Sequence, residues 1–153
     1  MTVSDTRTEA TDKSGQLIKE LLLESGHQVK SYQIVRDDIS EINTAVTHGI
    51  NENAIDAVII NGGTGIAKRD VTIEAVRTLL DKELPGFGEI FRYLSYELDI
   101  GSAAIMSRAL AGVARETALF SIPGSSGAVK LAMEKLILPE MGHIVMELRK
   151  DME

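Results

Sequence analysis

The chain has 153 residues, which fits one domain, with 44% hydrophobic and 25% charged residues. A chain of this size buries about 70% of its unfolded surface, so its core needs no covalent or metal support. Cysteine is absent, which excludes disulfides, thiolate catalysis and cysteine-based zinc sites. A net charge of −7 and an aromatic content of 4% argue against nucleic-acid binding. We expect one domain over residues 1–153.

The N-terminal residues, Met1 to Glu9, are polar and mixed in charge, so they do not resemble a signal peptide. No run approaches the roughly 20 apolar residues of a membrane span. We therefore predict a cytoplasmic protein that does not bind membranes. In a chain this acidic, a phosphate ligand would need positive charge gathered locally, from backbone N–H groups, Lys or Arg, or Mg²⁺.

The first half of the chain predicts alternating strands and helices. Residues 2–5 resemble the end of a strand running into a loop, and the apolar residues that should precede them are missing. Residues 14–24 predict a helix, because three leucines share one face and a glycine follows. Alternation over residues 29–35 predicts an outer strand, and residues 39–50 repeat at helical spacing. The apolar run at residues 56–60 is typical of a central parallel strand.

The middle of the chain predicts two further helices. Apolar residues between positions 73 and 80 mark the first. Residues 85–88, Pro-Gly-Phe-Gly, predict a break, after which residues 90–97 resume as a helix.

The last third predicts two strands and two helices. Residues 109–113 and 118–122 are close in sequence, which favours an antiparallel pair. Residues 129–138 predict a helix, and Pro139 predicts the start of another. Strands that alternate with helices imply an α/β fold. We expect a three-layer α/β/α sandwich around a mostly parallel sheet with a short antiparallel pair.

The strongest local signal is the loop from Asn61 to Gly65, where three glycines follow a buried strand within four residues. Glycines let backbone N–H groups approach an anion, and open α/β sheets bind ligands at the carboxyl ends of their strands. A tight turn without a ligand is an equally good explanation of the glycines alone. The spacing fits neither a dinucleotide fingerprint nor a phosphate loop, because Lys68 is followed by Arg69.

Two acidic positions follow predicted strand ends. Lys68 and Arg69 could hold phosphates, and Asp70 after them could ligate Mg²⁺. Asp37 and Asp38 follow another strand, and a second carboxylate at that edge would complete a Mg²⁺ site. Taken singly, each acid is better explained as a helix cap or a first-turn residue. The two basic side chains are then simply solvated.

A second loop, Pro123 to Gly127, also joins a strand to a helix. Ser125, Ser126 and the free N–H groups of the helix start form either an anion site or a capped turn. Arg108 could reach an anion, although such an arginine is more often a surface or interface residue. The three histidines share no ligand spacing, and we expect none to be catalytic: they are His27, His48 and His143.

The ordered combination of these motifs resembles the MoaB/Mog family of molybdenum cofactor biosynthesis proteins, from Thr2 to about His143. The ending at residues 134–140 resembles the MoaB branch. The motifs are TVSDTRT at 2–8, TDKSG at 11–15, GGTG at 62–65, RDVT at 69–72, PGFGE at 85–89, SR at 107–108 and PGSSGAV at 123–129.

The resemblance implies a MogA-like fold that binds molybdopterin. Active family members transfer AMP from Mg²⁺-ATP to the molybdopterin phosphate, and the product passes to the molybdate-inserting enzyme. It also implies a homo-oligomer, a trimer or a hexamer. For the MoaB branch, the alternative is a non-catalytic oligomeric carrier or scaffold for molybdopterin.

Carried over residue by residue, the resemblance assigns Asp37 and Asp70 to catalysis and Mg²⁺ binding. Two departures from the family pattern concern the shortened first strand and Ser126, which stands where many relatives have a proline. The residues implied to bind molybdopterin or nucleotide are Ser4, Asp5, Gly62, Gly63, Thr64, Gly65, Arg69, Pro123, Gly124, Ser125 and Ser126.

Overall fold

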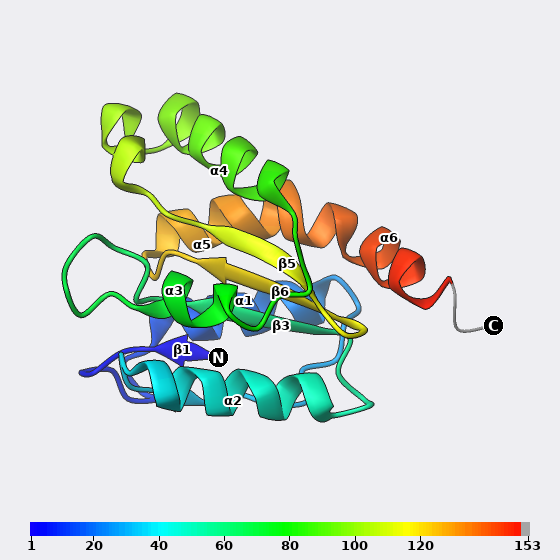
Figure 1. Cartoon of the computed structure of the whole chain (residues 1–153). Helices are drawn as coiled ribbons and strands as arrows, with labels where there is room; N and C mark the ends of the chain where they lie inside the picture. Colours follow the sequence, from blue (N-terminus) through cyan, green and yellow to red (C-terminus); the bar gives the residue numbers. More distant parts are fainter. Residues whose placement is uncertain (151–153) are drawn as a thin grey trace.

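A six-stranded sheet in the order β2-β1-β3-β6-β5-β4 forms the middle layer of the computed structural model, which describes residues 1–150 (Figure 1). The pairs β1–β2, β1–β3 and β3–β6 are parallel, and β5 pairs antiparallel with both β6 and β4. The predicted mostly parallel sheet with an antiparallel part is confirmed. The strands are β1 (Thr2–Val3), β2 (Ile34–Val35), β3 (Ala57–Asn61), β4 (Lys82–Glu83), β5 (Leu110–Ala114) and β6 (Thr117–Ile122).

Helices cover both faces of the sheet, as the strand–helix alternation predicts. In Figure 1, α2 lies on one side of the sheet, and α5 and α6 lie on the other. The helices are α1 (Lys13–Glu24), α2 (Ile39–Asn51), α3 (Thr72–Arg77), α4 (Pro85–Leu98), a 3₁₀ helix η1 (Gly101–Met106), α5 (Ser126–Ala132), a π turn η2 (Met133–Ile137) and α6 (Leu138–Arg149).

The core consists of two apolar clusters separated by the sheet. Successive residues of a strand point to opposite faces. Phe120 therefore joins the cluster under α1, α5 and α6, and Leu119 joins the cluster with α2 and α3. Ile59 and Ile60 of β3 divide in the same way. Burial on both faces explains why these strands are continuously apolar.

The strand predicted at residues 29–35 is wrong in length, because only Ile34 and Val35 form β2. Its neighbour β1 has two residues, Thr2 and Val3, and the ladder between them contains only those two pairs. The predicted position is correct, since β2 is the outermost strand on its side of the sheet. Residues 29–33 are not assigned to a strand, although the carbonyl of Gln33 accepts the N–H of Thr2 at 2.9 Å.

One proline prediction needs correction and the other is confirmed. Residues 85–88 do not break the chain, because Pro85 is the first residue of α4, a position that needs no backbone N–H. Pro139 lies in the first turn of α6, as predicted, and α6 follows η2 directly. The short β4 and the 3₁₀ helix had no clear sequence signal.

No helix formed by the described part of the chain combines the length and the apolar character needed to cross a bilayer.

Phe120 gives a direct test of the core. Its side chain is 2% exposed, and its ring lies 5.6 Å from that of Phe87, centroid to centroid. We expect Phe120→Ala to lower the free energy of unfolding by about 3–5 kcal/mol, because the lost contacts leave a cavity. Urea unfolding measures the change. The control Leu23→Ala, at an exposed position, should change it by about 0.5 kcal/mol or less, and equal effects of both would contradict this assignment.

Candidate functional site

A cavity of about 350 Å³ lies at the carboxyl ends of β1, β2, β3 and β6, and we call it the carboxyl-end cavity. Four chain segments form it, which brings together residues far apart in sequence. Ligands of open parallel sheets bind at this edge. Its walls are formed by Val3, Ser4, Asp5, Thr6, Arg7, Asp37, Gly62, Gly63, Thr64, Gly65, Arg69, Asp70 and Gly124.

Two glycines after β3 are required, because the backbone there has a positive φ and neighbouring atoms leave no space for a side chain. Gly62 has a φ of 99°, and a Cβ there would overlap the carbonyl oxygen of Val3. Gly63 has a φ of 62°, and a Cβ there would overlap the side chains of Asp37 and Thr72. The two glycines therefore let the loop pack closely on its neighbours, and both also line the cavity beside Asp37.

Asp37 lines the cavity, and its carboxylate is not fully hydrogen-bonded in the described part of the chain. Its Oδ1 atom is buried and has no hydrogen-bond partner within the described residues, and neither has Oγ1 of Thr72. Burial is the main reason that the pKa of Asp37 is raised, and the charges of Asp5 and Asp70 raise it further. Arg69 opposes them. A buried, unpaired acceptor next to two acids favours a cation or a donor from a ligand.

The neighbouring acids have distinct positions. Asp38 caps α2, since its carboxylate accepts the N–H of Glu41 at 3.0 Å. Asp70 does not cap α3, whose N-cap is Val71. Its Oδ2 atom instead accepts the N–H of Ala67 at 2.9 Å and closes the turn that brings it to the cavity. Of the two acids at positions 37 and 38, only Asp37 faces the cavity.

Arg108 holds the glycine loop in place instead of facing an anion. Its guanidinium donates to the carbonyl oxygens of Thr64 at 2.9 Å, Gly65 at 2.7 Å and Asp70 at 3.2 Å. An ion pair with Glu74 at 2.5 Å fixes the other side of the group. The hydrogen bond from Arg108 is the main reason that the pKa of Glu74 is lowered. The loop shape therefore depends on a residue far from it in sequence.

The N-terminal loop is anchored by Asp12, whose side chain is fully buried. Its carboxylate accepts hydrogen bonds from Thr2 at 2.5 Å, Tyr32 at 2.7 Å and the N–H of Gly15 at 3.0 Å. Burial alone would raise the pKa of Asp12, but these hydrogen bonds and Arg7 hold it below its usual value. Burial raises the pKa of Tyr32, and the hydrogen bond from Tyr32 to Asp12 and the charge of Asp12 raise it further.

Arg7 is a site residue that sequence reasoning missed. It bridges Asp12 at 3.3 Å and the carbonyl oxygen of Gly124 at 3.2 Å, and it lines the cavity. Ser14 donates to the same carbonyl at 2.5 Å. The sequence indicates Arg7 only through the motif that carries the family resemblance, because a lone arginine in a polar loop has no spacing signal.

The second loop contributes less to the cavity than predicted. Gly124 lines it, whereas Pro123, Ser125 and Ser126 do not. Ser125 caps α5 by accepting the N–H of Ala128 at 3.3 Å, so the capped turn expected as one alternative is present. Contacts of these three residues with a ligand stay a prediction.

No group of three or more His, Asp or Glu side chains within residues 1–150 is arranged to hold a metal ion. A divalent cation at Asp37 and Asp70 would therefore need further oxygens from a ligand. Mg²⁺ is commonly held in this way, by one or two carboxylates and substrate phosphates.

The raised pKa of Asp37 predicts how the stability of the fold depends on pH. The folded protein holds this proton more tightly than the unfolded chain, so ionisation of Asp37 destabilises the fold at neutral pH. We expect Asp37→Asn to raise Tm at pH 7 without ligand. The gain should shrink as the pH falls toward about 3.9, where the unfolded carboxyl also takes up its proton.

Thermal melts between pH 7 and pH 4 measure this effect. The matched control is Asp38→Asn, because asparagine also caps a helix and should leave Tm nearly unchanged. A lower Tm for Asp37→Asn at pH 7 would show that the ionised carboxylate stabilises the fold.

Comparison with known proteins identifies the family. Residues 1–143 match the family described as "Probable molybdopterin binding domain". Molybdenum cofactor biosynthesis protein B of Bacillus subtilis (strain 168) is 63% identical over 151 residues, which cover 99% of this chain and 89% of that protein.

Two solved structures agree with that match. The crystal structure of a molybdenum cofactor biosynthesis protein B has a TM-score of 0.96 at 62% identity, covering 98% of this chain and 93% of the other. The tungsten cofactor synthesizing protein MoaB from Pyrococcus furiosus has a TM-score of 0.85 at 44% identity, with 97% and 93% covered. The chain therefore belongs to the MoaB/Mog family of molybdenum cofactor biosynthesis proteins, in its MoaB branch.

Proposed function

We propose that this chain binds molybdopterin and adenylylates it with Mg²⁺-ATP. An oxygen of the molybdopterin phosphate forms a bond to the α-phosphorus of ATP, the bond between the α-phosphorus and the bridging oxygen to the β-phosphate breaks, and pyrophosphate leaves. The observation that carries the proposal is the buried, unpartnered Oδ1 of Asp37, which lies beside the bare glycine loop in a cavity shared with Asp70. The adenylylated product would then pass to the molybdate-inserting enzyme.

The chain's own groups suit a reaction that depends on positioning and charge neutralisation. Gly62, Gly63 and Gly65 line the cavity, and the backbone N–H groups of a glycine loop can approach phosphate oxygens closely. Arg7 and Arg69 line the cavity and add positive charge to it. No nucleophilic side chain is needed, because the attacking oxygen belongs to the substrate.

Asp37 and Asp70 are the residues that would hold Mg²⁺. The fit rests on the unpaired Oδ1 atom of Asp37 and on the mutual repulsion of Asp5, Asp37 and Asp70, which a divalent cation would relieve. Bound there, Mg²⁺ would neutralise charge on the transferring phosphate and its leaving group. Asp70 is already oriented by the N–H of Ala67.

The alternative is a non-catalytic carrier that binds molybdopterin in the same cavity without transferring AMP. The two functions are separated by incubating the purified protein with molybdopterin and Mg²⁺-ATP and following the adenylylated pterin by chromatography. Product formation that depends on Mg²⁺ supports the transferase. Bound pterin with no product from the wild type would refute the transferase and leave the carrier.

Asp70→Asn and Asp37→Asn should each lower the rate of AMP transfer by about 100-fold or more, because each removes a charge that acts on the transferring phosphate. Molybdopterin binding, measured by fluorescence, should survive in both. Asp38→Asn is the matched control, since Asp38 caps α2 and does not line the cavity. Equal loss in all three variants would place the effect in the fold instead of the site.

We also propose that the protein is a homo-oligomer, a trimer or a hexamer. Large apolar side chains are exposed along α4 and on η1, which packs beside it (Figure 1). Scattered exposed apolar residues are ordinary, but a cluster on adjacent elements favours an interface. On α6, Ile144 packs against the core, whereas Met146 is exposed. The exposed set on α4 and η1 is Ile90, Tyr93, Tyr96, Leu98, Ile105 and Met106.

Ile105→Asp tests that interface, because Ile105 is 86% exposed and carries little of the monomer's own core. We expect a lower sedimenting mass at unchanged helix content, since a charge would be buried without a partner. Met146→Asp, on α6, should keep the wild-type mass. A wild type that sediments as a monomer would overturn the oligomer proposal.

A further inference from the structure

The side chain of Thr72, the first residue of α3, is fully buried and does not line the carboxyl-end cavity. Its backbone N–H donates to the carbonyl of Gly63 at 3.0 Å, which fixes it against the glycine loop. Its hydroxyl oxygen, Oγ1, has no hydrogen-bond partner within the described residues. A buried hydroxyl without a partner destabilises a fold, so its presence needs an explanation.

The usual structural uses of a threonine at this position are absent. A threonine at a helix start most often caps the helix, with its hydroxyl accepting a backbone N–H. The N-cap of α3 is Val71 instead, and it makes no capping bond with its side chain. At the other end of α3, by contrast, Thr78 donates its hydroxyl to the carbonyl of Ala75 at 2.8 Å. The hydroxyl of Thr72 does not stabilise α3 in either way.

A second unpartnered oxygen lies beside this hydroxyl. A Cβ at Gly63 would be 2.2 Å from Oγ1 of Thr72 and 2.4 Å from Oδ1 of Asp37, so the two oxygens are neighbours. Oδ1 is also buried and without a partner among the described residues. One atom is a hydroxyl that can donate, and the other is a carboxylate oxygen that accepts. Because Gly63 has no side chain, the two oxygens are free to approach each other.

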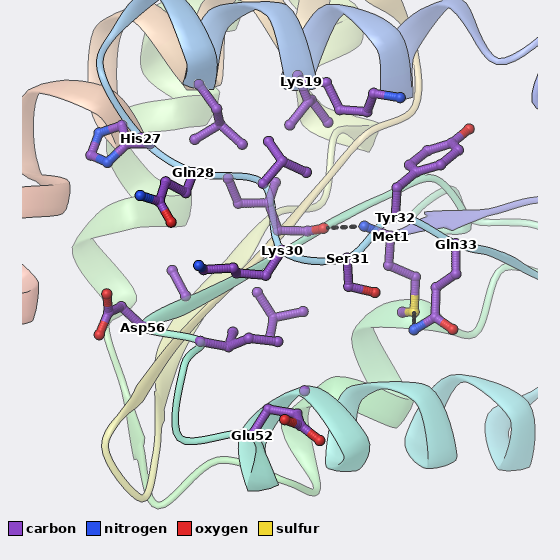
Figure 2. Close-up of a pocket in the computed structure, with 18 of the residues that line it drawn as sticks. Met1, Lys19, His27, Gln28, Lys30, Ser31, Tyr32, Gln33, Glu52 and Asp56 are labelled. Atoms are coloured by element: carbon purple, nitrogen blue, oxygen red, sulfur yellow. Dashed lines mark hydrogen bonds between the residues drawn. The ribbon is translucent and has the colours of Figure 1, made fainter.

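The pair is bordered by an apolar side chain. The third atom nearest to the Gly63 position is Cγ1 of Val3, at 3.1 Å. Val3 belongs to β1, which is held to β3 by the hydrogen bond that the amino group of Met1 donates to the carbonyl of Ile59 at 2.8 Å (Figure 2). An apolar neighbour raises the cost of an unpaired carboxylate oxygen. Of these three nearest atoms, only the hydroxyl can donate to that oxygen.

The carboxylate of Asp37 lies at the boundary between this buried pair and the cavity. Its Oδ1 atom is buried, whereas the residue as a whole is half-buried and lines the carboxyl-end cavity. A hydrogen bond to the buried oxygen would fix the plane of the carboxylate and leave its other oxygen to the cavity. Outer hydrogen-bond partners orient the ligands of metal ions in this way.

We propose that Thr72 is a positioning residue for the divalent cation of Mg²⁺-ATP: its hydroxyl donates to Oδ1 of Asp37 and directs the other carboxylate oxygen toward the cation. The inference rests on the function proposed above, because that function assigns Asp37 to Mg²⁺. The hydrogen bond requires only a rotation of the two side chains. Thr72 acts through Asp37 and touches neither the nucleotide nor the reacting atoms.

Thr72→Val tests this role, because valine has nearly the shape of threonine and lacks the hydroxyl. In calorimetric titrations of the full chain without molybdopterin, its affinity for Mg²⁺-ATP should be about tenfold lower than that of the wild type. Thr72→Ser keeps the hydroxyl and should bind within about threefold of the wild type. In EDTA, ATP alone should not distinguish the wild type from Thr72→Val, because the hydroxyl acts through a cation ligand.

Melting temperatures separate this role from a structural one. Removing a hydroxyl that stabilises the fold lowers Tm, whereas removing a buried, unpaired hydroxyl should leave Tm unchanged or raise it. The matched control is Thr78→Val, which removes the bonded hydroxyl at the other end of α3. It should lower Tm and keep the affinity for Mg²⁺-ATP within about twofold of the wild type. Circular dichroism melts without ATP measure Tm for all variants.

Several results would overturn the inference. They are wild-type affinity for Mg²⁺-ATP in Thr72→Val, an equal loss in Thr72→Ser, the same loss in EDTA, a fall in Tm as large as in Thr78→Val, and a wild type that does not bind Mg²⁺-ATP.

AMP transfer to molybdopterin is measured separately on the same variants. Binding of Mg²⁺-ATP by the wild type without product would refute the transferase, and a lower affinity in Thr72→Val would still support the role of Thr72. Product from the wild type together with unchanged affinity in Thr72→Val would refute that role and leave the transferase.

Discussion

The buried carboxylate of Asp12 is the interaction on which the carboxyl-end cavity depends. It accepts from Thr2 of β1, from the N–H of Gly15 in α1 and from Tyr32, and it pairs with Arg7. A buried carboxylate is stable only when its oxygens are satisfied, so these four segments are held to one arrangement. Arg7 then extends the connection to the carbonyl of Gly124 and joins the N-terminal loop to the loop after β6.

The electrostatics of the cavity follow from a conflict between charge and burial. The chain is acidic, with a net charge of −7, and the cavity itself gathers Asp5, Asp37 and Asp70. Arg7 and Arg69 offset part of that charge, and the pKa of Asp37 is still raised. The function proposed above would resolve this conflict, because a divalent cation that arrives with a phosphate satisfies the acids and the phosphate together.

Contacts between distant segments hold the backbone at the carboxyl ends of the sheet. The turn after β3 is fixed by Arg108 through three carbonyl oxygens, and its glycines let it pack closely on Val3, Asp37 and Asp70. Met1 ties β1 to β3 through its bonds to Ile59 and Asn61. The shape of the carboxyl-end cavity therefore depends on residues that lie far apart in the sequence.

Local sequence determined the features that depend on local physics. Apolar runs marked β3, β5 and β6, and the spacing of apolar residues marked α1 and α2. The glycines at 62–65 and Asp37 were identified because they directly follow strand ends, where parallel sheets bind ligands. The family was recognisable because several such motifs occur in one order along the chain.

Tertiary structure decided the rest, because the remaining features depend on residues that are distant in sequence. Asp37 and Asp38 are adjacent, yet the start of α2 turned one into a cap and left the other facing the cavity. Arg7 joins Asp12 nearby to Gly124, which lies 117 residues away, and Arg108 binds partners 34 to 44 residues away. Sequence patterns report periodicity and spacing, whereas these contacts arise only when the chain folds back on itself.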